Sequence, residues 1–138
     1  GVVLVDDYAH LPTEVMAVLA TARSGDFSRV VGVFQPHRFS RTEALWSSFG
    51  CAFDDADVLY VTDVYPSGEA PRPGVSGRLV ADAVLRDRPG ADVRYVARRE
   101  DLLDALVGEL RDGDLCLTMG AGDLTAVPDQ LRSRLGAS

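Results

Sequence analysis

A group of acidic and aromatic residues follows the first apolar run of the chain. Asp6 and Asp7 close this run, and Tyr8 and His10 come directly after it. Two carboxylates at the end of a strand can bind Mg²⁺ or the hydroxyl groups of a ribose, and an imidazole can meet an anionic ligand. The alternative is a helix-capping turn, a role that fits Thr13. Because a cap does not need a histidine in mid-loop, Asp7 and His10 together favour a functional site.

A second polar segment contains His37, Arg38 and Arg41. The two arginines are three residues apart, so they could point the same way and share one carboxylate or phosphate. A solvated surface pair is the alternative. In a chain whose net charge is −7, this cluster of cationic side chains favours an anion site. Ser40 or Thr42 is better explained as a helix cap than as a nucleophile.

Two further segments could line a site. The first, residues 63–71, reads Asp-Val-Tyr-Pro-Ser-Gly-Glu-Ala-Pro; a long loop in a compact domain is often functional, although crossover geometry alone also explains it. The second, residues 119–125, contains Gly120 and Gly122, which could let backbone N–H groups approach an anion at a helix N-terminus. The chain has no Lys, so it lacks a P-loop lysine. If it serves ATP chemistry, another domain must supply the main phosphate site.

The elements that must position these residues follow from the alternation of short β-branched runs with amphipathic stretches. Strands are predicted at residues 2–6, 30–34, 58–63, 93–96 and 115–119, and apolar stripes mark helices at 15–22, 45–53, 79–84, 102–110 and 127–135. This order predicts an α/β fold: a Rossmann-like three-layer domain with a mostly parallel sheet of about five or six strands. Ligands of such sheets bind outside the carboxyl ends of the strands, where the polar segments fall. Residues 97–100 predict only a helix start.

Composition limits the classes of function. The chain has 138 residues and 46% hydrophobic residues, which is enough for one domain with its own core. The net charge of −7 repels nucleic acid, and no apolar run approaches the length of a membrane span. Cys51 and Cys116 are expected to be buried free thiols in a reducing compartment. A strand at the first residues suggests that the chain is a piece of a longer protein.

Two other classes of protein share part of the pattern. An acidic pair after the first strand and Asp63 after the third resemble the acidic pocket of response-regulator receiver domains, which are phosphoacceptor signalling modules. Those domains place a Lys at the end of the fifth strand, however, and this chain has none. A stand-alone nucleotide-binding module is a third hypothesis, which an upstream sequence without a Gly-Lys-Thr/Ser motif would support.

Four segments taken together resemble successive motifs of the Mur ligase family. They are Asp-Asp-Tyr-Ala-His-Leu-Pro-Thr-Glu, Gln-Pro-His-Arg-Phe-Ser-Arg-Thr, Asp-Val-Tyr-Pro-Ser-Gly-Glu-Ala-Pro and Gly-Ala-Gly-Asp-Leu-Thr. They occur in the order of the family, from about Val2 to the last helix, and the second motif is typical of its alanine-adding members. The resemblance identifies residues 1–138 as the C-terminal domain of a three-domain cytoplasmic enzyme.

The resemblance implies an activity that this domain shares with the rest of such an enzyme. ATP phosphorylates the carboxylate of UDP-N-acetylmuramate, and the amine of L-alanine attacks the acyl phosphate to form an amide in peptidoglycan precursor synthesis. ATP and Mg²⁺ would be bound mainly by a central ATPase domain, the intramolecular partner, so this domain would be inactive alone. No partner nucleic acid or membrane is implied. The sequence leaves L-alanine open against glycine or L-serine.

The resemblance also implies roles for individual residues. Asp7 would contact the ATP ribose, and Tyr8 and His10 would line the reaction centre. Arg38 and Arg41 would hold the L-alanine carboxylate or the acyl-phosphate oxygens. Three further residues are expected to bind substrate beside them: His37, Gly120 and Gly122. The family commonly has His-His-Pro where this chain has His10-Leu11-Pro12; because the neighbouring motifs are intact, we expect Leu11 to be tolerated.

Overall fold

The computed structural model describes residues 1–136 and contains one five-stranded sheet. The strand order is β1-β5-β2-β3-β4, and every paired neighbour is parallel. This confirms the α/β three-layer fold and the parallel sheet predicted from the sequence. The strands are β1 (Val3–Asp7), β2 (Arg29–Phe34), β3 (Val58–Val61), β4 (Val93–Tyr95) and β5 (Asp114–Met119).

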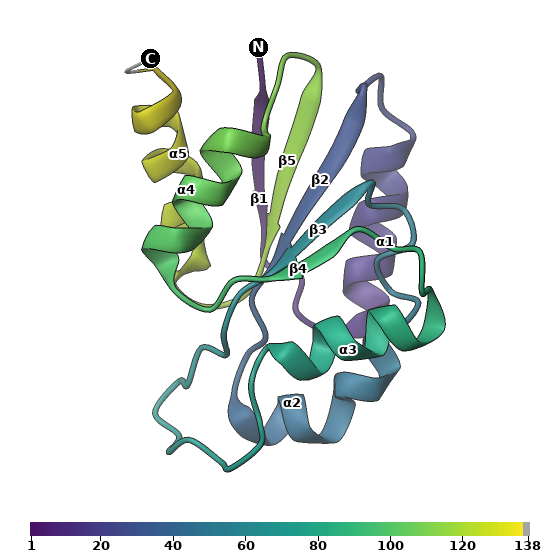
Figure 1. Ribbon diagram of the computed structural model, residues 1–138, viewed down its shortest axis with the longest axis vertical. Helices are drawn as coiled ribbons and strands as arrows, with labels where there is room; N and C mark the ends of the chain where they lie inside the picture. The colour runs from purple at the N-terminus through teal and green to yellow at the C-terminus, as the bar shows by residue number, and fades with distance from the viewer. Residues whose placement is uncertain (137–138) are drawn as a thin grey trace.

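Helices cover both faces of the sheet, as right-handed crossovers between parallel strands require. Figure 1 shows α1, α2 and α3 on one face and α4 and α5 on the other. The helices are α1 (Pro12–Arg23), α2 (Phe39–Leu45), α3 (Arg78–Asp87), α4 (Arg99–Glu109) and α5 (Val127–Gly136), with short 3₁₀ helices η1 (Trp46–Phe49) and η2 (Asp123–Ala126).

Two apolar clusters hold the layers together, one on each face of the sheet. In β2, Val30 and Phe34 belong to the cluster under α1 and α3, whereas Val31 and Val33 belong to the cluster under α4 and α5. All four side chains are almost fully buried. Successive side chains of a strand point to opposite faces, so a strand that is covered on both sides must be apolar throughout.

The second predicted helix is the element that departs most from its apolar stripe. The stripe runs from Leu45 to Phe53, but α2 ends at Leu45, the chain continues as η1, and turns follow from Gly50. A Cβ at Gly50 would lie 1.9 Å from the carboxylate of Asp87 on α3. The close approach of α3 therefore fixes a glycine here, where the regular helix has already ended.

The two cysteines lie in different environments. Cys116 in β5 is buried, and loss of solvation raises the pKa of its thiol to about 12. Cys51 is exposed, so the prediction that both thiols are buried is wrong for this residue. Its neighbours Ala52 and Phe53 take the inward positions of the turn, which leaves Cys51 on the outer side. Within residues 1–136, no helix combines the length and apolar character needed to cross a membrane.

Candidate functional site

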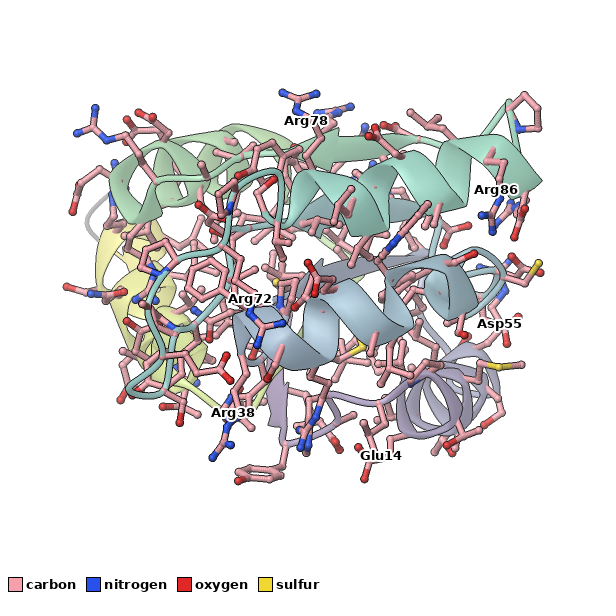
Figure 2. The ribbon with its side chains drawn as sticks, turned by 90° about the horizontal axis from the view of Figure 1, so that it is seen from below. Glu14, Arg38, Asp55, Arg72, Arg78 and Arg86 are labelled. Carbon is pink, nitrogen blue, oxygen red and sulfur yellow. The ribbon has the colours of Figure 1, made fainter. Side chains whose placement is uncertain are left out.

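The predicted site residues lie in loops at the carboxyl edge of the sheet. The loops after β1, β2, β3 and β5 all leave this edge because the four strands run in the same direction. Figure 2 looks onto this edge from below, with the Arg38 side chain pointing away from the ribbon into open space. The topology therefore brings together segments that are far apart in the sequence.

A chain of rings joins three of these loops. The ring of His10 lies 5.4 Å from the Tyr8 ring in an edge-to-face arrangement and 5.6 Å from the His37 imidazole. His37 in turn stacks on Tyr65 with ring centroids 5.7 Å apart. The His10 Nδ1 lies 3.0 Å from the backbone carbonyl of Tyr8, which fixes the imidazole orientation. The structure thus places His10 and His37 side by side, as one site requires.

The turn before α1 is capped by Glu14 rather than by Thr13. The Glu14 carboxylate accepts the backbone N–H groups of His10 and Leu11 at 3.2 and 3.0 Å, and these bonds lower the pKa of Glu14. Pro12 begins the helix, where its missing N–H costs nothing. Leu11 contributes only its backbone to these hydrogen bonds.

Arg38 adopts a backbone conformation that is rare for a residue other than glycine, with φ of 68°. Its N–H donates to the Tyr65 carbonyl at 2.8 Å, and its carbonyl accepts the backbone N–H and the hydroxyl of Thr42 at 3.1 and 2.8 Å. Such a conformation costs about 1–3 kcal/mol and persists only where neighbours enforce it. The Thr42 hydroxyl donates to a carbonyl, whereas a helix cap must accept a free N–H, so the prediction of a cap at Thr42 is wrong. Arg38 is held at the N-terminal boundary of α2.

The guanidinium groups of Arg38 and Arg41 lie at the start of α2 on this edge. Nine of the fourteen arginines form ion pairs with Asp or Glu. Within residues 1–136, neither Arg38 nor Arg41 makes a side-chain hydrogen bond or ion pair. Their charge is still felt locally, because both lower the pKa of His37 and Arg41 lowers that of Glu14. Two guanidinium groups without a carboxylate partner beside one imidazole are the kind of donors that anions take.

His37 is half-buried in this cluster. Loss of solvation is the main cause that lowers its pKa, and the positive charges of His10, Arg41 and Arg38 lower it further. Its Nδ1 is buried and makes no hydrogen bond within the described chain. These effects favour the uncharged imidazole, whereas the arginines carry a permanent positive charge.

The long loop after β3 is tied to the same region. The backbone N–H and the hydroxyl of Ser40 donate to the two carboxylate oxygens of Glu69, and these bonds lower the pKa of Glu69. Ser40 is thus anchored to the loop and does not cap α2. A small apolar cluster of Phe39, Val64 and Val75 packs beneath the loop. The loop thus packs against the segment that carries Arg38 and Arg41.

Asp63 does not form an acidic pocket with the carboxylates after β1. Its carboxylate accepts the backbone N–H groups of Val64 and Gly77 at 2.9 and 3.1 Å. Strands β5 and β2 separate β1 from β3, which places Asp63 on the order of 14 Å from Asp6 at ordinary strand spacing. The hydroxyl of Thr118 donates to Asp6. The receiver-like hypothesis is therefore wrong.

Asp7 has one free carboxylate oxygen. Its Oδ1 accepts the Ala9 N–H at 2.9 Å, and within the part of the chain described here Oδ2 takes no hydrogen bond. This leaves an acceptor for a ligand hydroxyl. No three His, Cys, Asp or Glu side chains of residues 1–136 gather into a metal site. The described residues therefore do not form a Mg²⁺ site by themselves.

The glycine turn after β5 has a structural function that the sequence did not predict. The Gly120 N–H donates to the Asp7 carbonyl at 3.1 Å, so this amide does not face an anion. A Cβ at Gly122 would lie 2.3 Å from the ring of Tyr65. A Cβ at Gly120 would lie 3.3 Å from the Cβ of Gln35, so both glycines stand where a neighbouring segment comes close, and the Gly120 amide, already bonded to Asp7, is not the one that could cradle an anion.

Gln35 and Arg99 are functional candidates that the sequence analysis missed. Gln35 is 5% exposed; its amide donates to Asp123 at 2.7 Å and accepts the Leu124 N–H at 3.2 Å. Arg99 donates to the same Asp123 carboxylate at 3.0 Å. Together they hold the turn that carries Gly122. Arg99 belongs to residues 97–100, which the sequence marked only as a helix start, and no local signal distinguishes it there.

Comparison with known proteins decides the family. The family model described as "Mur ligase, glutamate ligase domain" matches residues 1–122. The chain belongs to the Mur ligase family. It is 51% identical over 131 residues to a UDP-N-acetylmuramate–L-alanine ligase of Myxococcus xanthus, and 47% identical over 137 residues to the enzyme of that name in Rubrobacter xylanophilus. These matches cover 95% and 98% of this chain but only 28% and 31% of the relatives.

Solved structures agree with this family. The UDP-N-acetylmuramate–alanine ligase of Thermotoga maritima matches with a TM-score of 0.74 and 27% identity, over 99% of this chain and 27% of that one. A murein peptide ligase of Psychrobacter arcticus matches with a TM-score of 0.79 at 18% identity, over 99% of this chain and 28% of its own. The second likeness shows the shared fold alone. The chain therefore spans less than a third of each of these four relatives.

Proposed function

We propose that this chain is the amino-acid-contacting C-terminal domain of a cytoplasmic, ATP-dependent ligase that adds L-alanine to UDP-N-acetylmuramate. The observation that carries the proposal is the pair of unpaired guanidinium groups, Arg38 and Arg41, beside His10 and His37. The relatives at about half identity bear the name of this ligase. In such an enzyme the rest of the chain would supply the sites for the UDP-sugar and for most of ATP and Mg²⁺, so this domain would be inactive alone.

The electrostatics of the site suit an amino acid as the attacking substrate. A zwitterion must have its carboxylate held by cations while its amine loses a proton and attacks the acyl phosphate. Arg38 and Arg41 have no competing carboxylate, so they can bind the alanine carboxylate or the acyl-phosphate oxygens. Holding the amine in this geometry supplies several kcal/mol of the barrier, and the guanidinium charges stabilise the developing negative charge.

The remaining residues line this site in the proposed complex. Tyr8 is 68% exposed at the tip of its loop, which leaves its ring free to contact a ligand across the rim. The free Oδ2 of Asp7 can accept a hydrogen bond from a ribose hydroxyl. Gly120 and Gly122 place the turn after β5 against the same pocket. A small side chain such as that of alanine needs no charged partner, so glycine and L-serine are the natural competitor substrates to measure.

The test is an alanine substitution at Arg41 in the full-length ligase. Arg41→Ala removes one of two charge-assisted contacts, each about 1.5–3 kcal/mol, so kcat/KM for L-alanine should fall by about 10–100-fold. The matched control is Arg111→Ala, another exposed arginine without an ion pair in the described chain, which precedes β5 at the opposite edge of the sheet. Unchanged kinetics in Arg41→Ala, or an equal loss in the control, would defeat the assignment.

A further inference from the structure

The ring of Tyr65 contacts two segments of the site. The ring stacks on the His37 imidazole at 5.7 Å with planes 16° apart. It also fills the space where a Gly122 side chain would lie, since a Cβ there would come within 2.3–2.7 Å of three ring atoms. The Tyr65 ring thus links the loop after β2 to the turn after β5.

The backbone of Tyr65 holds the arginine segment as well. Its N–H donates to the Pro36 carbonyl at 2.9 Å, and its carbonyl accepts the Arg38 N–H at 2.8 Å. These two bonds form an isolated parallel bridge between His37 and Tyr65 beyond the end of the sheet. The strained backbone of Arg38 is therefore fixed on one side by Tyr65, and the His37 ring is supported by the Tyr65 ring.

The turn that faces the Tyr65 ring is itself held firmly. Gln35 binds both Asp123 and the Leu124 amide, and Arg99 binds Asp123 from α4. Gly122 precedes these anchored residues directly. A side chain added at Gly122 could not be accommodated by movement of the turn, so the Tyr65 ring would have to shift.

We propose that Tyr65 is a positioning residue for the anion site: its ring, seated against Gly122, fixes His37, and its backbone fixes Arg38 in the orientation that meets the carboxylate. The identity of that carboxylate as L-alanine rests on the function proposed above. Within residues 1–136 the Tyr65 hydroxyl makes no hydrogen bond, so the ring and not the hydroxyl carries the role. Tyr65 does not itself need to touch the substrate.

The kinetic test compares Tyr65→Phe with Tyr65→Leu in the full-length ligase. The phenylalanine variant keeps the ring, and its KM for L-alanine should stay within about twofold of the parent. The leucine variant loses the stacking surface, and a misplacement of about 1 Å should raise KM for L-alanine by about 10–100-fold while KM for ATP is unchanged. A merely structural role would lower the amount of active enzyme and leave KM for L-alanine as it was, which overturns the proposal.

A double-mutant cycle tests the contact with Gly122. Gly122→Ala alone should raise KM for L-alanine by about tenfold or more, because the new methyl group displaces the ring. In a Tyr65→Ala background, Gly122→Ala should leave KM for L-alanine almost unchanged, since there is no ring to displace. Gly108→Ala is the matched control: this α4 glycine has open space around its Cβ position. If Gly122→Ala raises KM for L-alanine by the same factor in both backgrounds, Gly122 and Tyr65 act independently and the proposal is wrong.

A labelling measurement checks the positioning without using activity. Diethyl pyrocarbonate modifies accessible neutral imidazoles, and cleavage after Arg29 and Arg38 isolates His37 in its own peptide for mass spectrometry. Tyr65→Leu should raise the modification rate of His37 several-fold relative to His10, whereas Tyr65→Phe should not. An unchanged rate overturns the proposal. If the rate rises but the parent enzyme does not use L-alanine, the positioning role stands and the proposed substrate is wrong.

Discussion

Replacing Asp114 by Asn should lower the stability of the fold. Asp114 is the first residue of β5 and lies at the edge of the sheet opposite the site. The Asp114 carboxylate is 1% exposed and accepts Nε and Nη2 of Arg29 at 3.0 and 2.7 Å. It also accepts the Arg111 N–H at 3.0 Å. The hydrogen bonds from Arg29 are the main cause that holds the pKa of Asp114 below its usual value, against the opposing effect of burial.

The expected loss of stability follows from these contacts. An asparagine keeps one acceptor oxygen but turns an N–H₂ group toward donors, so at least one charge-assisted bond of about 1.5–3 kcal/mol is lost. Orphaning a buried ion would cost about 3–5 kcal/mol, but Arg29 keeps its bond to Glu109 at 2.9 Å. We therefore expect Asp114→Asn to lower the free energy of unfolding by about 2–3 kcal/mol, and Tm by about 10 °C.

Urea and thermal unfolding near neutral pH measure this loss. The control is Asp129→Asn, the same change in a carboxylate that is 88% exposed and paired with Arg132 at 2.7 Å. Exposed pairs contribute about 0–1 kcal/mol, so the control should unfold almost as the parent does. A loss below about 1 kcal/mol in Asp114→Asn, or an equal loss in the control, would refute the reasoning.

The pH dependence of the Asp114 effect has a definite sign. Because folding lowers the pKa of Asp114, its contribution is complete above the unfolded pKa of about 3.9 and is lost as pH falls through the folded value. The difference between parent and Asp114→Asn should therefore shrink at about pH 3. A difference that stays constant or grows in acid would show that the charge is not its source.

Three further predictions concern the site edge. Gly77→Ala should lower the free energy of unfolding by about 1–3 kcal/mol, measured in urea, because its Cβ would lie 2.1 Å from the Thr62 carbonyl oxygen; an unchanged midpoint would contradict this packing. Gln35→Leu should lower the free energy of unfolding by about 1–3 kcal/mol, because it leaves the Leu124 N–H unpaired, and it should raise KM for L-alanine. If stability and KM both stay at parental values, the hydrogen bonds of Gln35 to the glycine turn are unimportant. Because the pKa of His37 is lowered, the unfolded chain binds a proton more readily, so stability should fall as pH drops below about 6.5, and His37→Asn should weaken that dependence in a pH series of unfolding curves.

Much of the fold could be predicted because strand and helix patterns are local. The apolar runs predicted all five strands to within two residues at each end. The central strands β2, β3 and β5 are buried on both faces and are therefore largely apolar, whereas Val3 and Val5 of the edge strand β1 are 46% and 41% exposed. The extent of the second helix could not be predicted in this way. Its regular part ends at Leu45, although apolar residues recur at helical spacing as far as Phe53.

The sequence by itself determined which residue types stand at the carboxyl ends of the strands: His10, Arg38, Arg41 and the glycines of the last turn. Side-chain chemistry and the βα alternation are properties of the chain order, so they could be recognised without coordinates. Only the tertiary structure decided that Tyr65 supports His37, and that Gln35 and Arg99 hold the glycine turn. These contacts join segments 24 to 88 residues apart, and such pairings depend on strand order and loop path, which no local pattern records.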